Sequence, residues 1–259
     1  MIDINREPGD YKYALQKVGF IKIKHNILYL SRQHEHIPTI AEFSILSALK
    51  KDIRGVHMSR PVRMLQYFDT HICSDENIAE FLSTILEECE TDEVSFEMEY
   101  EHELKKKAPI TDIWGSRYYR IIKKINIHKD HGIINDCIIL TVPVTTSCAC
   151  SKAISDYSSH NQRGFVTVTL QNPRNAVIED IIELVESAAS CPIFPVLKRA
   201  DEKYVTERVY DNARIVEDLA RIVAEKIDQH LAPNYFKICC RIEESILPYD
   251  SYAEVEVKH

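Results

Sequence analysis

A long polar connection near the middle of this sequence carries thiol and imidazole side chains at close spacing. Cys148 and Cys150 are two residues apart, and His160 follows twelve residues after Cys148. A cysteine thiolate and a histidine imidazole together suit a borderline-soft ion such as Zn²⁺ or Fe²⁺, and a bound ion would keep the thiol deprotonated at neutral pH. A single Cys-x-Cys pair is a weak metal signal, so the alternative is one buried thiol and one incidental cysteine.

A second polar run, over residues 197–212, mixes carboxylates with basic side chains in a predicted connection between two helices. Its basic members are Lys198, Arg199, Lys203 and Arg208. This mixture would bind a phosphorylated ligand and move protons beside it. Most charge runs are solvated surface, and that is the alternative here.

Two further positions carry weaker signals for ligand binding. Glu217 stands in the first turns of a predicted helix, where its carboxylate could accept two N–H bonds from a guanine or pterin edge. From position alone, ordinary solvation explains Glu217 better. His57 and Arg60 lie at a strand-to-helix connection, where a phosphate could meet a helix N-terminus, with a plain turn as the alternative.

The predicted strands and helices that must position these residues occur in the same order in the first and the second half of the chain. Alternating or aromatic-rich runs predict strands, and helical spacing of apolar residues predicts helices. The predicted strands cover 18–23, 27–30, 39–49, 96–101, 118–127, 137–144, 165–170, 235–242 and 251–257. The predicted helices cover 75–90, 177–190 and 213–231, and a short one can begin at Pro61.

This order predicts an α+β protein made of two tandem ββααββ units, residues 1–132 and 133–259. Each unit is expected to be an antiparallel sheet with helices on one face. The repeat lies in the order of the elements, since the two halves show no similarity at the level of residues. Four strands with one open face are incomplete alone, so we expect closure by a partner subunit.

Length and composition exclude several classes of protein. The chain has 259 residues, of which 45% are hydrophobic and 28% are charged, so we expect a folded globular protein. A net charge of −8 argues against nucleic acid as a partner, and no apolar stretch approaches the ~18 residues that cross a membrane. The N-terminus has charges and a proline where a signal peptide needs an apolar run, so we expect a cytoplasmic protein. Its eight cysteines are then expected to be thiols rather than disulfides.

Four stretches, in the same order along most of the chain, resemble the prokaryotic GTP cyclohydrolase type IB family. They are Gly55-Val-His-Met-Ser-Arg60; Val142-Pro-Val-Thr-Thr-Ser-Cys-Ala-Cys-Ser-Lys152 with Ser159-His-Asn-Gln-Arg163; Leu197-Lys-Arg-Ala-Asp-Glu-Lys-Tyr-Val-Thr-Glu-Arg208 with Tyr210-Asp-Asn212; and Glu243-Glu-Ser-Ile246 with Ser251-Tyr-Ala253. The resemblance implies a tunnelling fold (T-fold), whose ββααββ units form barrels across the subunits of a homotetramer, with active sites at the interfaces. It also implies that GTP is converted to 7,8-dihydroneopterin triphosphate and formate, the entry step to tetrahydrofolate.

The same resemblance assigns roles to individual residues. It implies one divalent ion per active site, Zn, Mn or Fe, held by Cys148, His160 and Glu202. It implies that Glu217 anchors the purine, and that the general acid and base come from His160, Glu202 or Glu244. The side chains expected to bind the rest of the substrate are His57, Arg60, Cys150, Lys152, Arg163, Lys198 and Arg199, with the role of Cys150 left open.

Two positions depart from the pattern of the family. Ala149 stands where the family has a proline between the two cysteines, which loosens the loop slightly. Leu247 stands where the family usually has a histidine directly after Glu-Ser-Ile. If that histidine binds metal or moves protons, another group or a water takes its place here, or the activity is weakened. Tyr249 and Asp250 are near enough in sequence to be considered.

Three other functions remain open at this point. An archaeal-type cyclohydrolase has similar motifs and gives a cyclic phosphate product. A relative with the same fold and thiol chemistry, such as a nitrile reductase, would use Cys148 or Cys150 as a nucleophile and would oxidise NADPH without a metal. A purine- or pterin-binding protein with impaired catalysis, suggested by Leu247, would bind GTP and release no formate.

Overall fold

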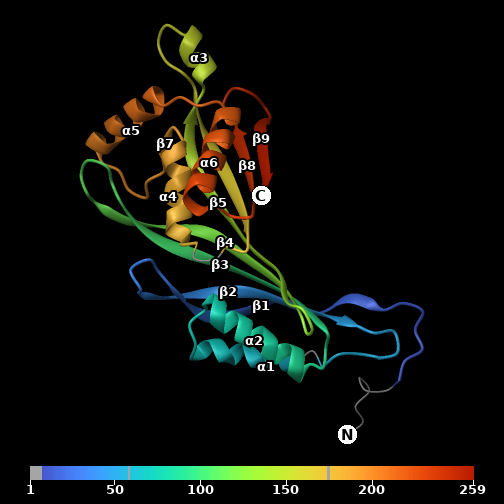
Figure 1. Ribbon diagram of the computed structural model, residues 1–259. Coiled ribbons are helices and arrows are strands. Elements are labelled where there is room, and N and C mark those ends of the chain that lie inside the picture. The colour runs from blue at the N-terminus through green and yellow to red at the C-terminus, as the bar shows by residue number, and fades with distance from the viewer. Residues whose placement is uncertain (1–7, 58, 174–175) are drawn as a thin grey trace. The chain divides into compact units, whose positions relative to one another are not determined.

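A computed structural model of the chain describes residues 8–57, 59–173 and 176–259 (Figure 1). The sheet has the strand order β1-β2-β3-β4-β5-β6-β8-β9, with β7 paired to β5. The strands are β1 Leu15–Leu30, β2 His36–Leu49, β3 Glu93–Lys107, β4 Trp114–His128, β5 Gly132–Ser147, β6 Asn161–Gln171, β7 Cys191–Pro192, β8 Tyr235–Glu243 and β9 Asp250–Lys258. The helices are α1 Ser59–Met64, the 3-10 helix η2 Leu65–Asp69, α2 Asp75–Glu88, α3 Ala149–Ile154, α4 Ile178–Ala188, α5 Arg199–Asp211 and α6 Val216–Leu231.

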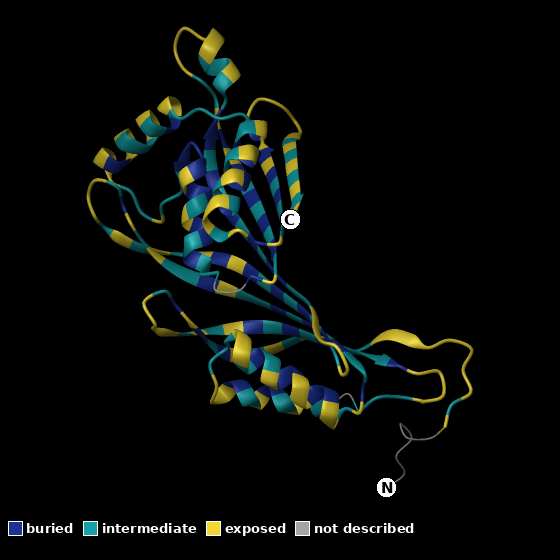
Figure 2. Cartoon of the chain, viewed as in Figure 1, coloured by how far each residue is buried: buried dark blue, intermediate teal, exposed yellow. Residues whose placement is uncertain are grey.

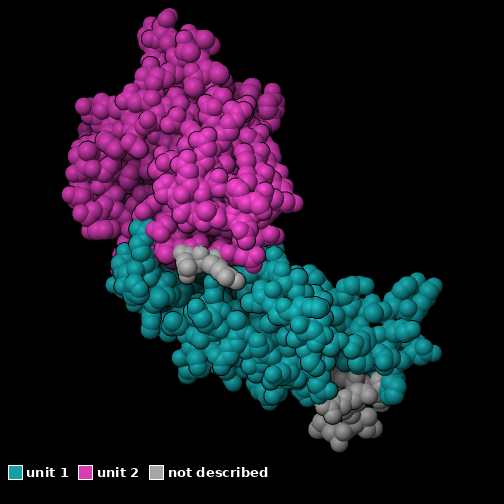
Figure 3. Space-filling model, viewed as in Figure 1, with its two compact units in different colours: residues 1–101, 122–137 teal, residues 102–121, 138–259 magenta. Residues whose placement is uncertain are grey.

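The chain divides into two compact units (Figure 3). Unit 1 consists of residues 1–101 and 122–137, and unit 2 consists of residues 102–121 and 138–259. The first half of the chain has two strands, helices and two strands, and the second half repeats this order with α3, β7 and α5 added. The boundary between residues 132 and 133 that the sequence suggests stays a prediction.

Helix α2 packs on the sheet of unit 1 because its apolar residues recur at helical spacing. The Ser74 hydroxyl caps the helix by accepting a hydrogen bond from the backbone N–H of Asn77 at 3.2 Å. On the buried face, the ring centroid of Phe81 lies 6.2 Å from that of Phe96 in β3. The helix predicted over 75–90 is therefore confirmed. Its buried residues are Ile78, Phe81, Leu82, Ile85 and Leu86.

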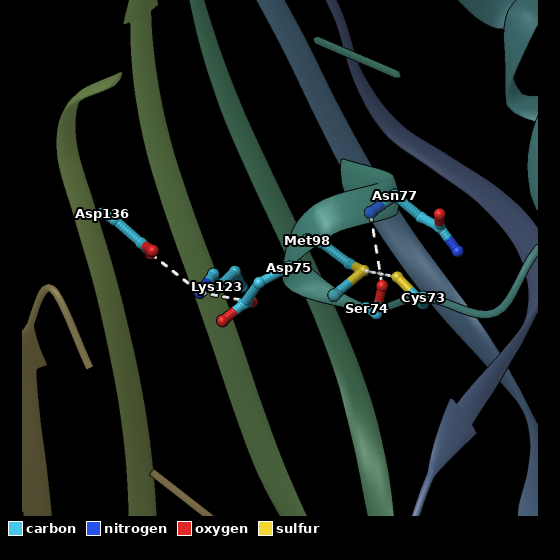
Figure 4. Close-up of polar contacts among 7 residues, drawn as sticks. All are labelled: Cys73, Ser74, Asp75, Asn77, Met98, Lys123 and Asp136. Carbon is cyan, nitrogen blue, oxygen red and sulfur yellow. Dashed lines mark hydrogen bonds and ion pairs between the residues drawn. The ribbon is translucent and has the colours of Figure 1, made fainter. Parts of the chain in front are cut away.

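A buried lysine fastens the start of α2 to two strands of the same unit (Figure 4). The side chain of Lys123 in β4 is 5% exposed, and its Nζ lies 2.9 Å from Asp75 Oδ1 and 2.8 Å from Asp136 Oδ1. Burial lowers the pKa of Lys123, but the two carboxylates outweigh burial and hold it above its ordinary 10.5. Beside this cluster, the Cys73 thiol donates to Met98 Sδ at 3.3 Å.

Unit 2 is built on strands whose side chains alternate between buried and more exposed positions, as Figure 2 shows. In the register of β6 and β8, Arg163 stands opposite Glu243 and Thr167 stands opposite Cys239. Helix α6 contacts β8, β9 and α4, and it ends at Ala232, which has a left-handed backbone conformation. The helices predicted over 177–190 and 213–231 correspond to α4 and α6. The buried residues of α6 are Val216, Leu219, Ala220, Val223, Ala224 and Ile227.

Helix α5 differs from the prediction, because the sequence indicates a connection over 197–212 and the structure has a helix there. Of its residues, only Asp201 and Val209 are buried. The helix therefore lacks the apolar stripe by which α2, α4 and α6 could be recognised. Within the described parts of the chain, no helix is both long enough and apolar enough to cross a membrane.

Candidate functional site

The two ends of the 148–160 segment meet at the junction of β5 and β6. The backbone N–H of Cys148 donates to the carbonyl of His160 at 3.2 Å. Cys148 is also the N-cap of α3, and its Sγ accepts from the N–H of Ser151 at 3.4 Å. Figure 1 shows α3 projecting from the end of β5. The segment therefore returns on itself, which brings the predicted thiol and imidazole residues together.

The imidazole of His160 is oriented by two polar side chains. Its Nδ1 lies 2.8 Å from Oε1 of Gln162, which is almost fully buried, and 3.3 Å from the hydroxyl of Ser245. An amide oxygen can only accept, so this contact matches the tautomer that is protonated at Nδ1 and has its lone pair on Nε2. An imidazole held in this way at one nitrogen is the usual form of a histidine metal ligand.

The donor atoms fit a divalent metal ion in part. Cys148 and His160 offer one sulfur and one nitrogen, the pair that Zn²⁺ and related ions accept. Glu202 is exposed on α5, where its N–H donates to Lys198 and its carbonyl accepts from Thr206. Among the described residues, no group of three or more His, Cys, Asp or Glu side chains is close enough to hold an ion. The structure thus brings together two of the three predicted ligands.

Lys152 contacts the C-terminal end of α5. Its Nζ donates to the carbonyl of Tyr210 at 2.6 Å and lies 3.4 Å from the carbonyl of Asp211. The same ammonium lies 4.2 Å from the centre of the Tyr210 ring. A phosphate at Lys152 would have to compete with these carbonyls, so the predicted role of Lys152 in phosphate binding stays a prediction.

Glu244 lies in the β8–β9 connection, next to the Ser245 that contacts His160. Its carboxylate is half-buried and accepts a hydrogen bond from the Ser251 hydroxyl at 2.8 Å. Leu247 lies two residues beyond Ser245 in the same connection and is 46% exposed. The position where the family has its histidine is therefore in the segment that contacts His160.

The other predicted residues lie at helix ends or on strands. Glu217 is exposed in the first turn of α6, and Arg163 is exposed on β6. Lys198 and Arg199 are at the start of α5, and Cys150 is exposed in α3. All of these belong to unit 2.

His57 and Arg60 belong to unit 1. The Arg60 guanidinium donates to the carbonyl of Glu88 at the end of α2. His57 lines a cleft of about 390 Å³ together with Lys50 and Asp92, which form an ion pair at 2.7 Å. Met58, which the resembling Gly55–Arg60 stretch includes, lies outside the described residues.

Comparison with known proteins identifies the family. A family model described as type I GTP cyclohydrolase FolE2 matches residues 1–253. This chain belongs to the type I GTP cyclohydrolase FolE2 family. It is 35% identical to GTP cyclohydrolase FolE2 of Thermosipho africanus over 256 residues, which is 98% of this chain and 96% of that protein. It is 36% identical to the FolE2 of Fervidobacterium nodosum over 251 residues, 97% of this chain and 95% of that protein.

Solved structures support the fold of this FolE2 family member. A hyperthermostable mutant of Bacillus sp. TB-90 urate oxidase aligns with a TM-score of 0.59 at 10% identity, covering 95% of this chain and all of the other. Uricase from Arthrobacter globiformis aligns with a TM-score of 0.52 at 9% identity, covering 94% of this chain and 93% of the other. At such low identity the likeness concerns the fold alone. The predicted α+β tunnelling fold is confirmed.

Three residues at the site were missed by sequence reasoning as partners of the predicted ones. Gln162 follows His160 at a spacing of two, which in an extended segment puts both side chains on one side, so this contact could have been inferred. Ser245 reaches His160 across 85 residues of sequence, and no local pattern indicates that. Asp201 is fully buried, although the charge run around it is typical of a solvated segment.

Proposed function

We propose that this chain is a metal-dependent GTP cyclohydrolase that converts GTP and water to 7,8-dihydroneopterin triphosphate and formate, the first step of tetrahydrofolate biosynthesis. The observation that carries the proposal is the pairing of Cys148 with an oriented His160 in a chain of the FolE2 family. Within type I we assign the chain to the type IB enzymes, on the Cys-Ala-Cys-Ser-Lys152 and His-Asn-Gln-Arg163 stretches.

Two donors of the proposed metal site are the first and the last residue of the 148–160 segment. Cys148 Sγ and His160 Nε2 would hold a Zn, Mn or Fe ion, with Glu202 as the third ligand. When bound, such an ion supplies Lewis acidity that makes a water nucleophilic toward C8 of the purine at neutral pH. The Gln162 side chain contacts Nδ1 and would keep Nε2 available for the ion.

Binding of GTP is proposed to combine one carboxylate with several cations. Glu217 would accept two N–H bonds from the guanine edge, and such bonds to a charged acceptor are stronger than neutral ones. Arg163, Lys198 and Arg199 would contact the triphosphate, and His57, Arg60, Cys150 and Lys152 complete the proposed substrate-binding set. The net charge of −8 does not oppose this, because a local basic pocket acts on a ligand at short range.

Proton transfer to N7 and to the leaving N9 needs a group that can both give and take a proton at the substrate. The Nδ1 proton of His160 is engaged by Gln162, so Glu244 is the better candidate for the general acid and base. Glu244 lies in the connection that contacts His160 through Ser245, and its Oε1 accepts a hydrogen bond from the Ser251 hydroxyl, which orients the carboxylate.

A second candidate function is a GTP-binding protein with impaired catalysis. Leu247, in the connection that contacts His160, is the observation that favours it, because leucine can neither bind metal nor move a proton. The archaeal-type product, a cyclic phosphate, is the remaining variant of the cyclohydrolase proposal. These three functions differ in what becomes of GTP.

We also propose a cytoplasmic homotetramer with its active sites at subunit interfaces. The terminal strands β1 and β9 each pair with one neighbour in the sheet order, so each leaves an edge that a second subunit can extend. All eight cysteines are free thiols, as expected of a protein in a reducing compartment.

The test is to load the protein with Zn²⁺, Mn²⁺ or Fe²⁺, incubate it with GTP, and assay formate, neopterin fluorescence after oxidation, and product mass. Formate with a linear triphosphate supports the proposal. Formate with a cyclic phosphate supports the archaeal-type variant. Binding of GTP without formate under all three metals contradicts the enzyme assignment and favours the binding protein.

A further inference from the structure

Asp201 of α5 is a carboxylate that is fully buried yet surrounded by hydrogen-bond donors. Its Oδ1 accepts from the backbone N–H of Ile110 at 2.8 Å and of Thr111 at 2.9 Å. Its Oδ2 accepts from the Thr111 hydroxyl at 2.6 Å and from the N–H of Lys198 at 2.9 Å. The side chain has no exposed surface. Four donors therefore satisfy both oxygens of a charge that water cannot reach.

These bonds join two separate segments of unit 2. Ile110 and Thr111 lie in the turn between β3 and β4, which is closed by a 2.8 Å bond from the N–H of Ala108 to the carbonyl of Ile113. Lys198 is the N-cap of α5, so Asp201 completes a capping box at that end. Both oxygens of Asp201 thus bind donors of the turn and of the helix start at once. The carboxylate therefore links the turn to the helix.

In the first turn of α5, Asp201 is buried while Arg199, Ala200 and Glu202 are exposed. Asp201 and Val209 are the buried residues of this helix, and Val209 lies two turns later. At the far end, Lys152 binds the last carbonyls of the helix. Asp201 is therefore the buried anchor of the first turn, and its bonds orient the side chains of that turn. The next residue is Glu202, which faces outward, since successive side chains are about 100° apart around a helix.

We propose that Asp201 is a positioning residue that fixes Glu202 as a metal ligand by anchoring the start of α5 to the β3–β4 turn. This inference rests on the proposed function, in which Glu202 is the third ligand. Asp201 itself touches neither metal nor substrate. It acts through the backbone that both residues share, as supporting residues behind metal ligands generally do.

The test is a double-mutant cycle on metal affinity, with Mn²⁺ binding to the full-length protein measured by electron paramagnetic resonance. Asp201→Asn keeps the size of the side chain but replaces one acceptor oxygen by an NH₂ group, which then faces the hydrogen-bond donors of the turn and the helix start. We expect it to weaken Mn²⁺ binding by about ten- to a hundredfold. In a Glu202→Gln background the same change is expected to have no further effect, because both substitutions act on one ligand. Glu207→Gln is the matched control, an exposed residue of the same helix, and should leave affinity unchanged.

A merely structural role predicts a different pattern, namely equal weakening by Asp201→Asn in both backgrounds, and this result would overturn the inference. A second result would overturn the inference and leave the proposed function intact. In that result, folded Asp201→Asn binds Mn²⁺ as tightly as wild type, while Glu202→Gln loses its affinity for Mn²⁺. If Glu202→Gln binds Mn²⁺ as tightly as wild type, the proposed ligand is wrong and the inference fails with it. Where Asp201→Asn does not fold, Thr111→Val removes one donor only, and the same cycle applies with an expected weakening of several-fold.

Discussion

The Nδ1 of His160 lies 2.8 Å from Oε1 of Gln162, an almost fully buried amide two residues further along the chain. This contact orients the ring and matches the tautomer that has its lone pair on Nε2. Most of what we propose for the reaction depends on that orientation.

Replacing Gln162 should therefore loosen the imidazole without removing it. We expect Gln162→Leu to weaken metal binding by about tenfold or more, because the ring loses the partner of its Nδ1 proton. Gln162→Glu keeps an acceptor and should retain most of the affinity. The measurement is metal content after dialysis against a chelator series. Gln171→Leu, at the other end of β6, is the control, and equal metal content in Gln162→Leu and this control would refute the orienting role.

A substitution at Leu247 is predicted to increase the activity. Leu247→His restores the residue that the family usually has, in the connection that contacts His160. We expect it to raise kcat for formate release by about tenfold or more, since a positioned acid or base typically contributes that much or more. Leu247→Gln is polar but does not titrate and should not raise kcat. An unchanged kcat in Leu247→His would mean that Glu244 or another group already does this work.

Glu217 is predicted to recognise the guanine edge, and this gives a selective prediction. Glu217→Gln should raise KM for GTP by about ten- to a hundredfold, because a charged acceptor of two N–H bonds is lost. The loss should be smaller for inosine triphosphate, which lacks the 2-amino group. Asp218→Asn, the neighbouring carboxylate on α6, serves as the control. Equal losses for the two nucleotides would show that Glu217 does not contact the 2-amino group.

Unit 1 allows a prediction about stability. Lys123→Met should destabilise unit 1 by about 2 to 4 kcal/mol, because it leaves Asp75 and the largely buried Asp136 without their cation. Lys124→Met is the control, since its ion pair with Glu97 is exposed and contributes little. Hydrogen exchange of the α2 amides measures the difference.

The same lysine predicts a pH dependence. Its folded-state pKa is raised above the ordinary 10.5, so its contribution is fully present below that pH and is lost as pH rises through the folded value. The gap between wild type and Lys123→Met should thus persist at neutral pH and shrink in strong alkali. A gap that instead shrinks on acidification from neutral to about pH 6 would contradict this assignment.

The sequence carried enough information for the elements that bury an apolar stripe. Helix α2 has the Ser74 cap and apolar residues at helical spacing, and α6 has a comparable stripe, so both could be predicted. Helix α5 could not, because it buries a single apolar residue, Val209, and polar contacts at Asp201 and Lys152 hold its two ends. A prediction based on the spacing of apolar residues therefore does not detect such a helix.

The candidate site, too, could be predicted from the sequence only in part. The motif Cys-x-Cys with His160 could be read directly, and the return of the 148–160 segment brings Cys148 and His160 together. The contact of Ser245 with His160 depends on the pairing of β6 with β8, which is a property of the sheet as a whole. The placement of Glu202 near the metal stays a prediction, because the described residues include no group of three such side chains close enough to hold an ion.

The most direct test of the cyclohydrolase account is to follow the carbon that the reaction must expel. GTP labelled with ¹³C at C8 is incubated with the metal-loaded protein and with a Cys148→Ala variant, and formate is followed by nuclear magnetic resonance. The account predicts one labelled formate for each GTP consumed by the wild-type protein, and none from the variant. Labelled GTP that stays intact with Zn²⁺, Mn²⁺ and Fe²⁺ in turn would contradict it.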